Sequence, residues 1–254
     1  MTKSLQDKIA LVTGASRGIG KAIALKLASE GATVGVHFRT EASRADEVVS
    51  SIEGSGGRAF VLQADLTNVG SIAAMFDAFD RKLAEFGTSK FDILVNNAGT
   101  NAEGSVETLS EADYDHLFAT NVKGLFFTSQ YGVPRLNDGG RLINLSSMVG
   151  HNAYPTAVAY AATKAAVDSM TLSMAAGLGP RGITVNAVAP GATETDFIGK
   201  YMQDEAFMSY FAAAAALGRL GQPSDIADVV AFVASDAARW ITGERIRVSG
   251  GMHL

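Results

Sequence analysis

Short runs rich in Val, Ile and Leu recur along this chain, and longer segments with a helical pattern separate them. The runs lie at 8–13, 33–38, 58–64, 92–97, 141–146, 183–189 and 245–249. The helical segments lie roughly at 18–30, 42–53, 69–86, 110–136, 155–178 and 223–235. Most runs are almost continuously apolar, which is typical of strands that helices cover on both faces. Strand and helix alternating in this way predict an α/β fold, a doubly wound, seven-stranded parallel sheet with helices on both faces.

The length and the composition fit one such domain. A chain of 254 residues with 47% hydrophobic and 19% charged residues can build one substantial core. No internal repeat or linker-like segment divides it, so residues 1–254 are predicted to form a single domain. The net charge of −5 argues against a nucleic-acid partner, because a protein that holds phosphates needs a basic surface.

Membrane, disulfide and metal-binding patterns do not occur in the sequence. No stretch approaches the roughly 18 apolar residues that a membrane span needs, and the N-terminus does not follow a signal-peptide pattern. The chain has no cysteine, which excludes disulfides and thiolate metal sites. Its histidines, at 37, 116, 151 and 253, lack metal-ligand spacing. We therefore expect a cytoplasmic protein with neither a metal nor a membrane partner.

A glycine-rich turn, "TGASRGIG", follows the first predicted strand and leads into a helix. Gly14, Gly18 and Gly20 let the backbone approach a diphosphate, and the helix start offers free N–H groups and a positive dipole end. Such a turn alone can be purely structural. At the start of a strand–helix–strand unit, it favours a nucleotide site.

The segment after the second predicted strand, "HFRTE", indicates which dinucleotide binds. NAD-binding domains usually place an acidic side chain here to hold the adenosine ribose, whereas this chain has Phe38 followed by Arg39. An arginine can pair with a 2′-phosphate but accepts no hydrogen bond from a ribose, and Arg17 can add a second positive group. Two solvated surface arginines are the alternative. We predict NADP(H) as the preferred cofactor and NAD(H) as the second option.

The next two strand ends carry weaker signals. Asp65, after the third strand, can hydrogen-bond an adenine amino group or cap the helix that follows. After the fourth strand, "NNAG" (Asn96 to Gly99) can lie against a cofactor or form a turn only.

The residues suited to chemistry are Ser147, at the end of the fifth strand, and the Tyr160–Lys164 pair of "YAATK". Positions four apart on a helix share a face, so the phenol and the ammonium are neighbours. Reducing a ketone needs a hydride on carbon and a proton on oxygen. A phenol with a pKa of about 10 is a poor proton donor, and a nearby ammonium favours its phenolate. No Gly-x-Ser-x-Gly surrounds the serine, so a hydride-transfer site is favoured over a nucleophilic serine.

Several motifs together resemble the short-chain dehydrogenase/reductase family from about residue 7 to residue 251: "TGASRGIG", "NNAG", "TNVKG", Ser147, "YAATK", "PGATETD" and "WITGERIRVSGG". The resemblance implies a Rossmann fold and an oxidoreductase acting on CH–OH donors with NAD(P)+ as acceptor. Ser147 would polarise the carbonyl, Tyr160 would be the acid/base, and Lys164 would bind the nicotinamide ribose and lower the tyrosine pKa. Asn121 would hold a proton-relaying water, but it can equally be a buried residue that satisfies backbone groups in a kinked helix.

The resemblance also implies a set of cofactor contacts. They are Gly14, Ser16, Arg17, Gly18, Ile19, Gly20, Arg39, Asp65, Leu66, Asn97, Ala98, Gly99, Tyr160, Lys164, Pro190, Gly191, Thr193 and Thr195.

Within the family, the carboxyl-terminal half looks most like the 3-oxoacyl-acyl-carrier-protein reductases. An acyl carrier protein is acidic, so its reductase should carry a basic patch beside the cleft. Arg181 matches one basic position of those reductases, whereas Asn137 and Asp138 stand where they tend to have Lys and Arg. A free ketone, an aldehyde or a sugar-like carbonyl is therefore at least as good a candidate substrate as an acyl-carrier thioester.

The resemblance places a mobile substrate lid at about 197–217. Its Met and aromatic side chains suggest an apolar substrate portion, and a helix packed on the core is the equal alternative. The 155–178 helix is apolar or small almost all round, so both of its faces need cover. The resemblance implies a homotetramer, in which this helix and the 110–136 helix form the dimer contact.

Three other functions remain as alternatives. One is an NAD(P)-dependent dehydrogenase of a sugar or another small secondary alcohol. Another is an NADP-binding sensor without catalysis, against which the intact Ser147, Tyr160 and Lys164 argue. A nucleotide-sugar or methyl-transfer enzyme is disfavoured, because the glycine spacing and the absent ribose-binding acid do not suit it.

Overall fold

The computed structural model describes residues 3–253 of the chain, and only the backbone at 200 and 201. Within these residues, seven parallel strands form one sheet in the order β3-β2-β1-β4-β5-β6-β7. This confirms the predicted α/β fold. The strands are β1 (Ile9–Val12), β2 (Thr33–Phe38), β3 (Arg58–Gln63), β4 (Phe91–Asn96), β5 (Leu136–Leu145), β6 (Thr184–Pro190) and β7 (Arg245–Val248).

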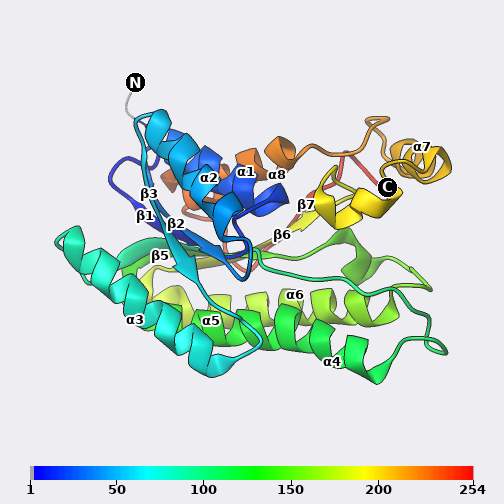
Figure 1. Ribbon diagram of the computed structural model, residues 1–254, viewed down its shortest axis with the longest axis horizontal. Helices are drawn as coiled ribbons and strands as arrows, with labels where there is room; N and C mark the ends of the chain where they lie inside the picture. Colours follow the sequence, from blue (N-terminus) through cyan, green and yellow to red (C-terminus); the bar gives the residue numbers. More distant parts are fainter. Residues whose placement is uncertain (1–2, 254) are drawn as a thin grey trace.

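Helices cover both faces of the sheet (Figure 1). On one face lie α1 (Gly18–Ser29), α2 (Ala42–Gly54) and α8 (Pro223–Ala234). On the other lie α3 (Val69–Glu85), α4 (Glu111–Phe118), α5 (Leu125–Gly132) and α6 (Val158–Leu178). The strand order reverses between β1 and β4, so their carboxyl ends border the crevice in which such sheets bind ligands.

Each face of the sheet has its own apolar core. Ile23 of α1 and Val230 of α8 belong to the core on the first face and are fully buried. On the second face Phe79 of α3 meets Phe91 of β4 edge to face, with ring centroids 5.0 Å apart. Strands sandwiched in this way must be apolar on both sides, which explains their nearly continuous Val, Ile and Leu runs.

The predicted helix at 110–136 is not one regular helix. It consists of α4, a π-helical segment η1 (Ala119–Gly124), α5 and a 3-10 turn η2 (Val133–Arg135). Asn121 lies within the π-helical segment, where its side chain bonds the backbone of Thr100. A tertiary contact of this kind can stabilise the wider turn. The helical segment is therefore irregular at Asn121, and the backbone that Asn121 bonds lies outside the helix.

Other differences concern segment bounds and short helices. Strand β5 begins at Leu136, five residues before the predicted run, because Leu136 pairs with Phe91 of β4. Helix α7 (Glu205–Ala214) lies within the predicted lid. Asp204 caps its N-terminus: the Asp204 side chain accepts hydrogen bonds from two backbone N–H groups in the first turn of α7. In Figure 1, α7 lies beyond the end of the sheet rather than over either face. Across residues 3–253, every helix is too short or too polar to cross a bilayer.

Candidate active site

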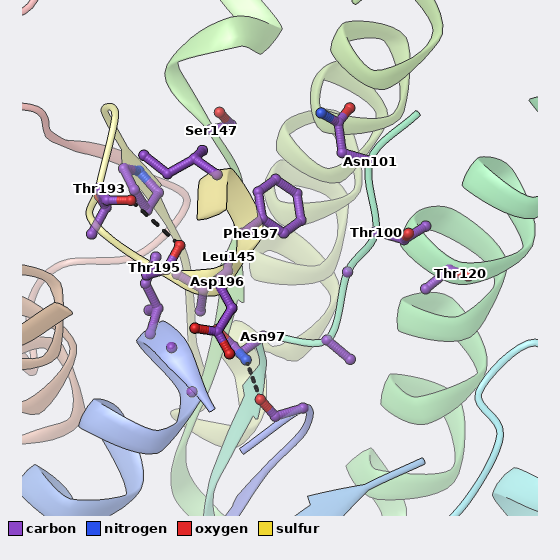
Figure 2. A pocket seen from close by; sticks show the side chains of 18 of the residues that line it. Asn97, Thr100, Asn101, Thr120, Leu145, Ser147, Thr193, Thr195, Asp196 and Phe197 are labelled. Carbon is purple, nitrogen blue, oxygen red and sulfur yellow. Dashed lines mark hydrogen bonds between the residues drawn. The ribbon is translucent and has the colours of Figure 1, made fainter. Parts of the chain in front are cut away.

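A cleft of about 690 Å³ opens at the carboxyl ends of the strands. It is lined by all of the residues predicted to contact a cofactor, and by Ser147. Figure 2 shows Asn97, Asp196 and Thr195 in the part of the cleft nearest α1, and Ser147, Phe197 and Asn101 farther from it. The topology therefore brings the separate motifs together at one edge of the sheet.

The glycine-rich turn has no room for side chains at two of its glycines. A Cβ on Gly20 would lie 2.2 Å from the Gly14 carbonyl oxygen and 2.4 Å from Asn97 Nδ2. Gly14 adopts a φ of 61°, and a Cβ there would lie 2.9 Å from Ala98 Cα. Backbone and Asn97 therefore close the floor of the turn, and only glycine fits at these two positions.

Buried polar side chains brace this turn. The Asn97 amide donates to the carbonyls of Thr13 (2.8 Å) and Gly14 (3.0 Å), and one Asn97 bond is visible in Figure 2. His37, at the end of β2, accepts the Gly14 N–H at Nδ1 (2.9 Å) and faces the Ala64 carbonyl with Nε2 (3.2 Å). Burial lowers the pKa of His37 to about 4, so a neutral ring with its proton on Nε2 fits both contacts.

His37 was not predicted as a site residue. A histidine inside an otherwise apolar strand run is the signal that marks it, because a buried polar group needs partners. Here its partners are the backbone groups of the cofactor turn.

The structure fits a dinucleotide at this turn. Within the described residues, no side chain caps α1, whose first turn carries Gly18, Ile19 and Gly20 along the cleft. Free N–H groups at a helix start bind anions such as a diphosphate.

Charged side chains also line the cleft. Arg17, Arg39 and Asp65 line it, and Arg39 contributes to the lowered pKa of Asp65, after the hydrogen bonds from Thr67. Asp65 accepts the Thr67 N–H (2.9 Å) and hydroxyl (2.8 Å). It does not cap α3; that role belongs to Asn68, whose side chain accepts from the Ser71 N–H. The capping alternative for Asp65 was wrong, because the helix begins at Val69.

Tyr160 and Ser147 meet inside the cleft. Burial raises the pKa of Tyr160 to about 12, and a hydrogen bond from the Ser147 side chain offsets part of that rise. Both hydroxyls thus face one spot, where a substrate oxygen can sit. The pKa of Tyr160 is raised rather than lowered, because loss of hydration outweighs the stabilisation of the phenolate.

Lys164 follows one helical turn later on α6. Its Nζ lies 5.7 Å from the centre of the Tyr160 ring and donates to the Leu145 carbonyl (2.8 Å). Burial lowers the pKa of Lys164 to about 8, while the carboxylate of Asp168 acts in the opposite direction. The ammonium therefore points into the site, beside the phenol.

Asn121 does not line the cleft. Its amide donates to the Thr100 carbonyl (2.9 Å) and Thr163 Oγ1 (3.2 Å), and its oxygen accepts the Thr100 N–H (2.8 Å). The side chain thus satisfies backbone groups beside a π-helical turn, as the alternative interpretation predicts. A Cβ on Gly99 would lie within 4 Å of both Asn121 Oδ1 and Lys164 Nζ, so the amide still borders the site.

The predicted lid contributes aromatic side chains to the cleft. Phe197, Phe207 and Phe211 line it, and the Phe197 ring lies 6.1 Å from the Tyr160 ring. Asp196, which directly precedes the lid, pairs with Arg44 of α2 (2.7 Å). None of the described residues of α7 is buried, so this helix is not packed on the core.

Tyr154 and Met252 also line the cleft and were not predicted. The Tyr154 hydroxyl meets His253 Nε2 at 3.1 Å, and the His253 N–H donates to the carbonyl of Ala214 in α7. The C-terminal segment thus joins the lid to the loop before α6. Tyr154 and His253 are 99 residues apart, so a local sequence pattern does not indicate their contact.

Comparisons with known proteins agree with this geometry. Residues 14–253 match the family model described as Enoyl-(Acyl carrier protein) reductase. The chain is 42% identical to the 3-oxoacyl-[acyl-carrier-protein] reductase FabG of Staphylococcus aureus, over 100% of this chain and 99% of that protein.

Two solved structures are also close. The angucycline C-6 ketoreductase LanV with bound NADP shares 43% identity at a TM-score of 0.94, covering 100% of this chain and 98% of that chain. The promiscuous reductase LugOII, which catalyses keto-reduction at C1 during lugdunomycin biosynthesis, shares 44% identity at a TM-score of 0.94, covering 99% of this chain and 100% of that chain.

Proposed function

The chain belongs to the short-chain dehydrogenase/reductase family of oxidoreductases, and we propose that it reduces a ketone with NADPH. The observation that carries this proposal is the meeting of Ser147 and Tyr160 in a cleft lined by a dinucleotide turn, with Lys164 beside the phenol. Each of these groups has a role in moving one proton to a carbonyl oxygen.

In this proposal Ser147 and Tyr160 hold the carbonyl oxygen between their hydroxyls. Bound NADPH would supply the hydride to the carbon, and its oxidised ring a positive charge near the phenol. Tyr160 donates its proton to the oxygen on which negative charge develops. The Lys164 ammonium stabilises the phenolate that remains, because an opposite charge nearby favours the ionised form.

The arginines at the adenosine end support NADPH over NADH. Arg17 and Arg39 both line the cleft, and Phe38 stands where an acidic ribose ligand would lie. A guanidinium pairs well with a phosphate and offers a ribose hydroxyl no acceptor. The similar ketoreductase LanV was solved with bound NADP.

The lining of the outer cleft supports a substrate with an apolar, ring-containing body. Phe197, Phe207 and Phe211 come from the lid, and Tyr154 and Met252 from outside it. Aromatic and Met side chains pack well on flat apolar rings. The lid would close over such a substrate, and Asp196, which directly precedes the lid, pairs with Arg44 of α2.

An acyl carrier protein is less well supported as a partner. Arg181 pairs with Asp138 (2.8 Å) and donates to the carbonyls of Val133 and Leu136. A guanidinium engaged in this way is a weak anchor for an acidic partner. The match to the reductase FabG keeps a carrier thioester as the second candidate substrate.

Exposed apolar side chains support the proposed homotetramer. A second hollow spans α4, η1, α5 and α6 and is lined by Phe118, Phe126 and Met170, among others. Phe232 is exposed on α8, on the opposite face of the sheet. Large exposed apolar groups on separate faces suit an assembly with more than one kind of contact. Light scattering of the purified protein measures its mass directly.

The test of the proposed activity is NADPH oxidation across a panel of carbonyl compounds. The panel includes polycyclic aromatic ketones, simple aldehydes, a keto-sugar, an acetoacetyl thioester and an enoyl thioester. We expect turnover of ketones with an apolar ring system. Turnover of the enoyl thioester alone, or of no compound with Tyr160 intact, contradicts the proposal.

A further inference from the structure

Three chain segments meet at Asp168, and two of them, α6 and the turn after Ser147, line the active-site cleft. Asp168 lies on α6, one helical turn after Lys164 and two turns after Tyr160. His151 comes from η3 (Met148–His151), the turn that directly follows Ser147. Arg245 is the first residue of β7. Asp168 thus contacts groups from outside its own helix.

The Asp168 carboxylate is nearly enclosed by these groups. Its side chain is 10% exposed, and one oxygen, Oδ2, lies 2.9 Å from His151 Nε2 and 3.2 Å from Arg245 Nε. The His151 contact is a hydrogen bond, whereas Arg245 Nε lacks hydrogen-bonding alignment. The second oxygen, Oδ1, is buried and has no hydrogen-bond partner among the described residues. A buried carboxylate with one unsatisfied oxygen is costly, which argues for a role beyond packing.

Asp168 is linked to the turn that follows Ser147 and lies on the same helix as Lys164. Arg245 Nη2 lies 3.9 Å from Met148 Sδ, next to Ser147, so Asp168 is linked to the serine turn through both His151 and Arg245. On its own helix it faces Lys164, and the carboxylate raises the pKa of that lysine against the lowering by burial. The pKa of Tyr160 is governed by burial and Ser147 instead.

We infer that Asp168 is a positioning residue of the reaction: its carboxylate lies one helical turn beyond Lys164 and ties the turn after Ser147 to the helix that carries Tyr160 and Lys164. The inference rests on the proposed function of these three residues. Asp168 touches neither the reacting atoms nor the cleft. It acts through Lys164, whose charge the proton transfer needs, and through His151.

Several charged or titratable groups face this centre. Tyr160, Lys164 and Asp168 come from α6, His151 from the turn after β5, and Arg245 from β7. The segment η1 contributes the neutral amide of Asn121. Asp168 is the carboxylate that opposes the burial of Lys164.

The experiment measures the ionisation of Lys164 itself, without relying on turnover. The protein is labelled with trace acetic anhydride over a range of pH, and mass spectrometry follows acetylation of the Lys164 peptide. The Asp168→Asn variant keeps the shape of the side chain and removes its charge. In this variant we expect the pH midpoint of Lys164 acetylation to fall by about one pH unit. Asp168→Glu restores the charge and should move the midpoint back. The alkaline limb of ketone reduction should shift in parallel.

His151→Gln is the matched control. It removes the imidazole and leaves the Asp168 carboxylate next to Lys164, so the Lys164 midpoint should stay in place. An unchanged midpoint in Asp168→Asn overturns the inference. Equal shifts in Asp168→Asn and His151→Gln also overturn it, because the charge of Asp168 is then not what sets the Lys164 midpoint. Labelling succeeds whether or not a ketone is reduced, so failure of the proposed function is recognised separately.

Discussion

The ammonium nitrogen of Lys164 lies 5.7 Å from the centre of the Tyr160 ring, and both side chains line one cleft, Lys164 buried and Tyr160 partly exposed. Loss of hydration disfavours the charged form of each group. Burial raises the pKa of the phenol to about 12 and lowers that of the amine to about 8. Such opposed environments are typical of groups that exchange protons during catalysis. The predictions below depend on this pair and on the turn that faces it.

Replacing Tyr160 with Phe removes the proton donor and keeps the ring. Ketone reduction should fall by about 10² to 10⁴-fold, the usual contribution of a positioned acid. The dissociation constant for NADPH, measured by fluorescence, should stay close to that of the parent. A variant that still turns over at the parental rate rules out the acid role of Tyr160.

Replacing Arg39 with Asp should move cofactor preference toward NADH. The change removes a partner for a 2′-phosphate and adds an acceptor for ribose hydroxyls, so the ratio of kcat/KM for NADPH to that for NADH should fall about 10 to 100-fold. Arg239→Asp makes the same charge change at an exposed residue and serves as control. If both variants behave alike, net charge rather than Arg39 sets the preference.

Replacing Lys164 with Met should stabilise the protein while abolishing activity. The folded pKa of about 8 lies below the usual 10.5, so the folded state is penalised fully below pH 8, and the penalty fades between pH 8 and 10.5. After the loss of the Leu145 hydrogen bond, the net gain at pH 7 should be about 2 kcal/mol. Urea unfolding at pH 7 and pH 11 measures it, and a gain of equal size at both values contradicts the electrostatic cause.

His37 should make stability fall in mild acid. Its folded pKa of about 4 lies below the usual 6.5, so the unfolded chain binds the proton first as the pH drops. The loss begins below about pH 6.5 and is complete below about pH 4, where it amounts to about 3 kcal/mol. His37→Gln should show a shallower decline between these values in urea unfolding, and the exposed His116→Gln the parental one. If the free energy of unfolding falls equally steeply with pH in the parent and both variants, His37 is not the cause of the acid destabilisation.

Adding a methyl group at Gly20 should close the cofactor turn. The new Cβ would lie 2.2 Å from the Gly14 carbonyl oxygen, so the backbone must shift. We expect Gly20→Ala to raise the dissociation constant for NADPH at least tenfold, about 1.4 kcal/mol. Gly177→Ala is the matched control on α6, where nothing lies within 4 Å of the new atom, and it should stabilise by about 0.5–1 kcal/mol. Parental NADPH affinity in Gly20→Ala contradicts the proposed role of the turn.

The sequence predicts the sheet because the central strands are buried on both faces and are therefore continuously apolar. Val34 and Val36 of β2 are fully buried, as are Leu11 and Val12 of β1, so the apolar runs mark the strands to within a residue or two, except at the start of β5. The strand ends then locate the cleft, because parallel strands finish at the same edge. This reasoning brings together the glycine turn, Ser147 and Tyr160 without coordinates.

Contacts between distant segments could not be predicted in the same way. The break at Asn121 depends on its bonds to Thr100, whereas the local pattern through 110–136 reads as continuous helix. Arg44 and Asp196 are 152 residues apart, and only the fold shows that they pair. The pKa values of buried groups also depend on the packing around them, which a motif does not describe.

The chain between β4 and α5 leaves the sheet and returns to it. Two hydrogen bonds between the Thr100 backbone and the Asn121 side chain hold the two ends of this segment together. Of the residues between these two anchors, Asn101, Glu103 and Thr120 line the cleft. Within the loop from 101 to 109, Gly104 pairs with Ala157 and donates its N–H to the Thr156 carbonyl (2.9 Å), so a change in the length of this loop would alter both the lining of the cleft and the start of the helix that carries Tyr160.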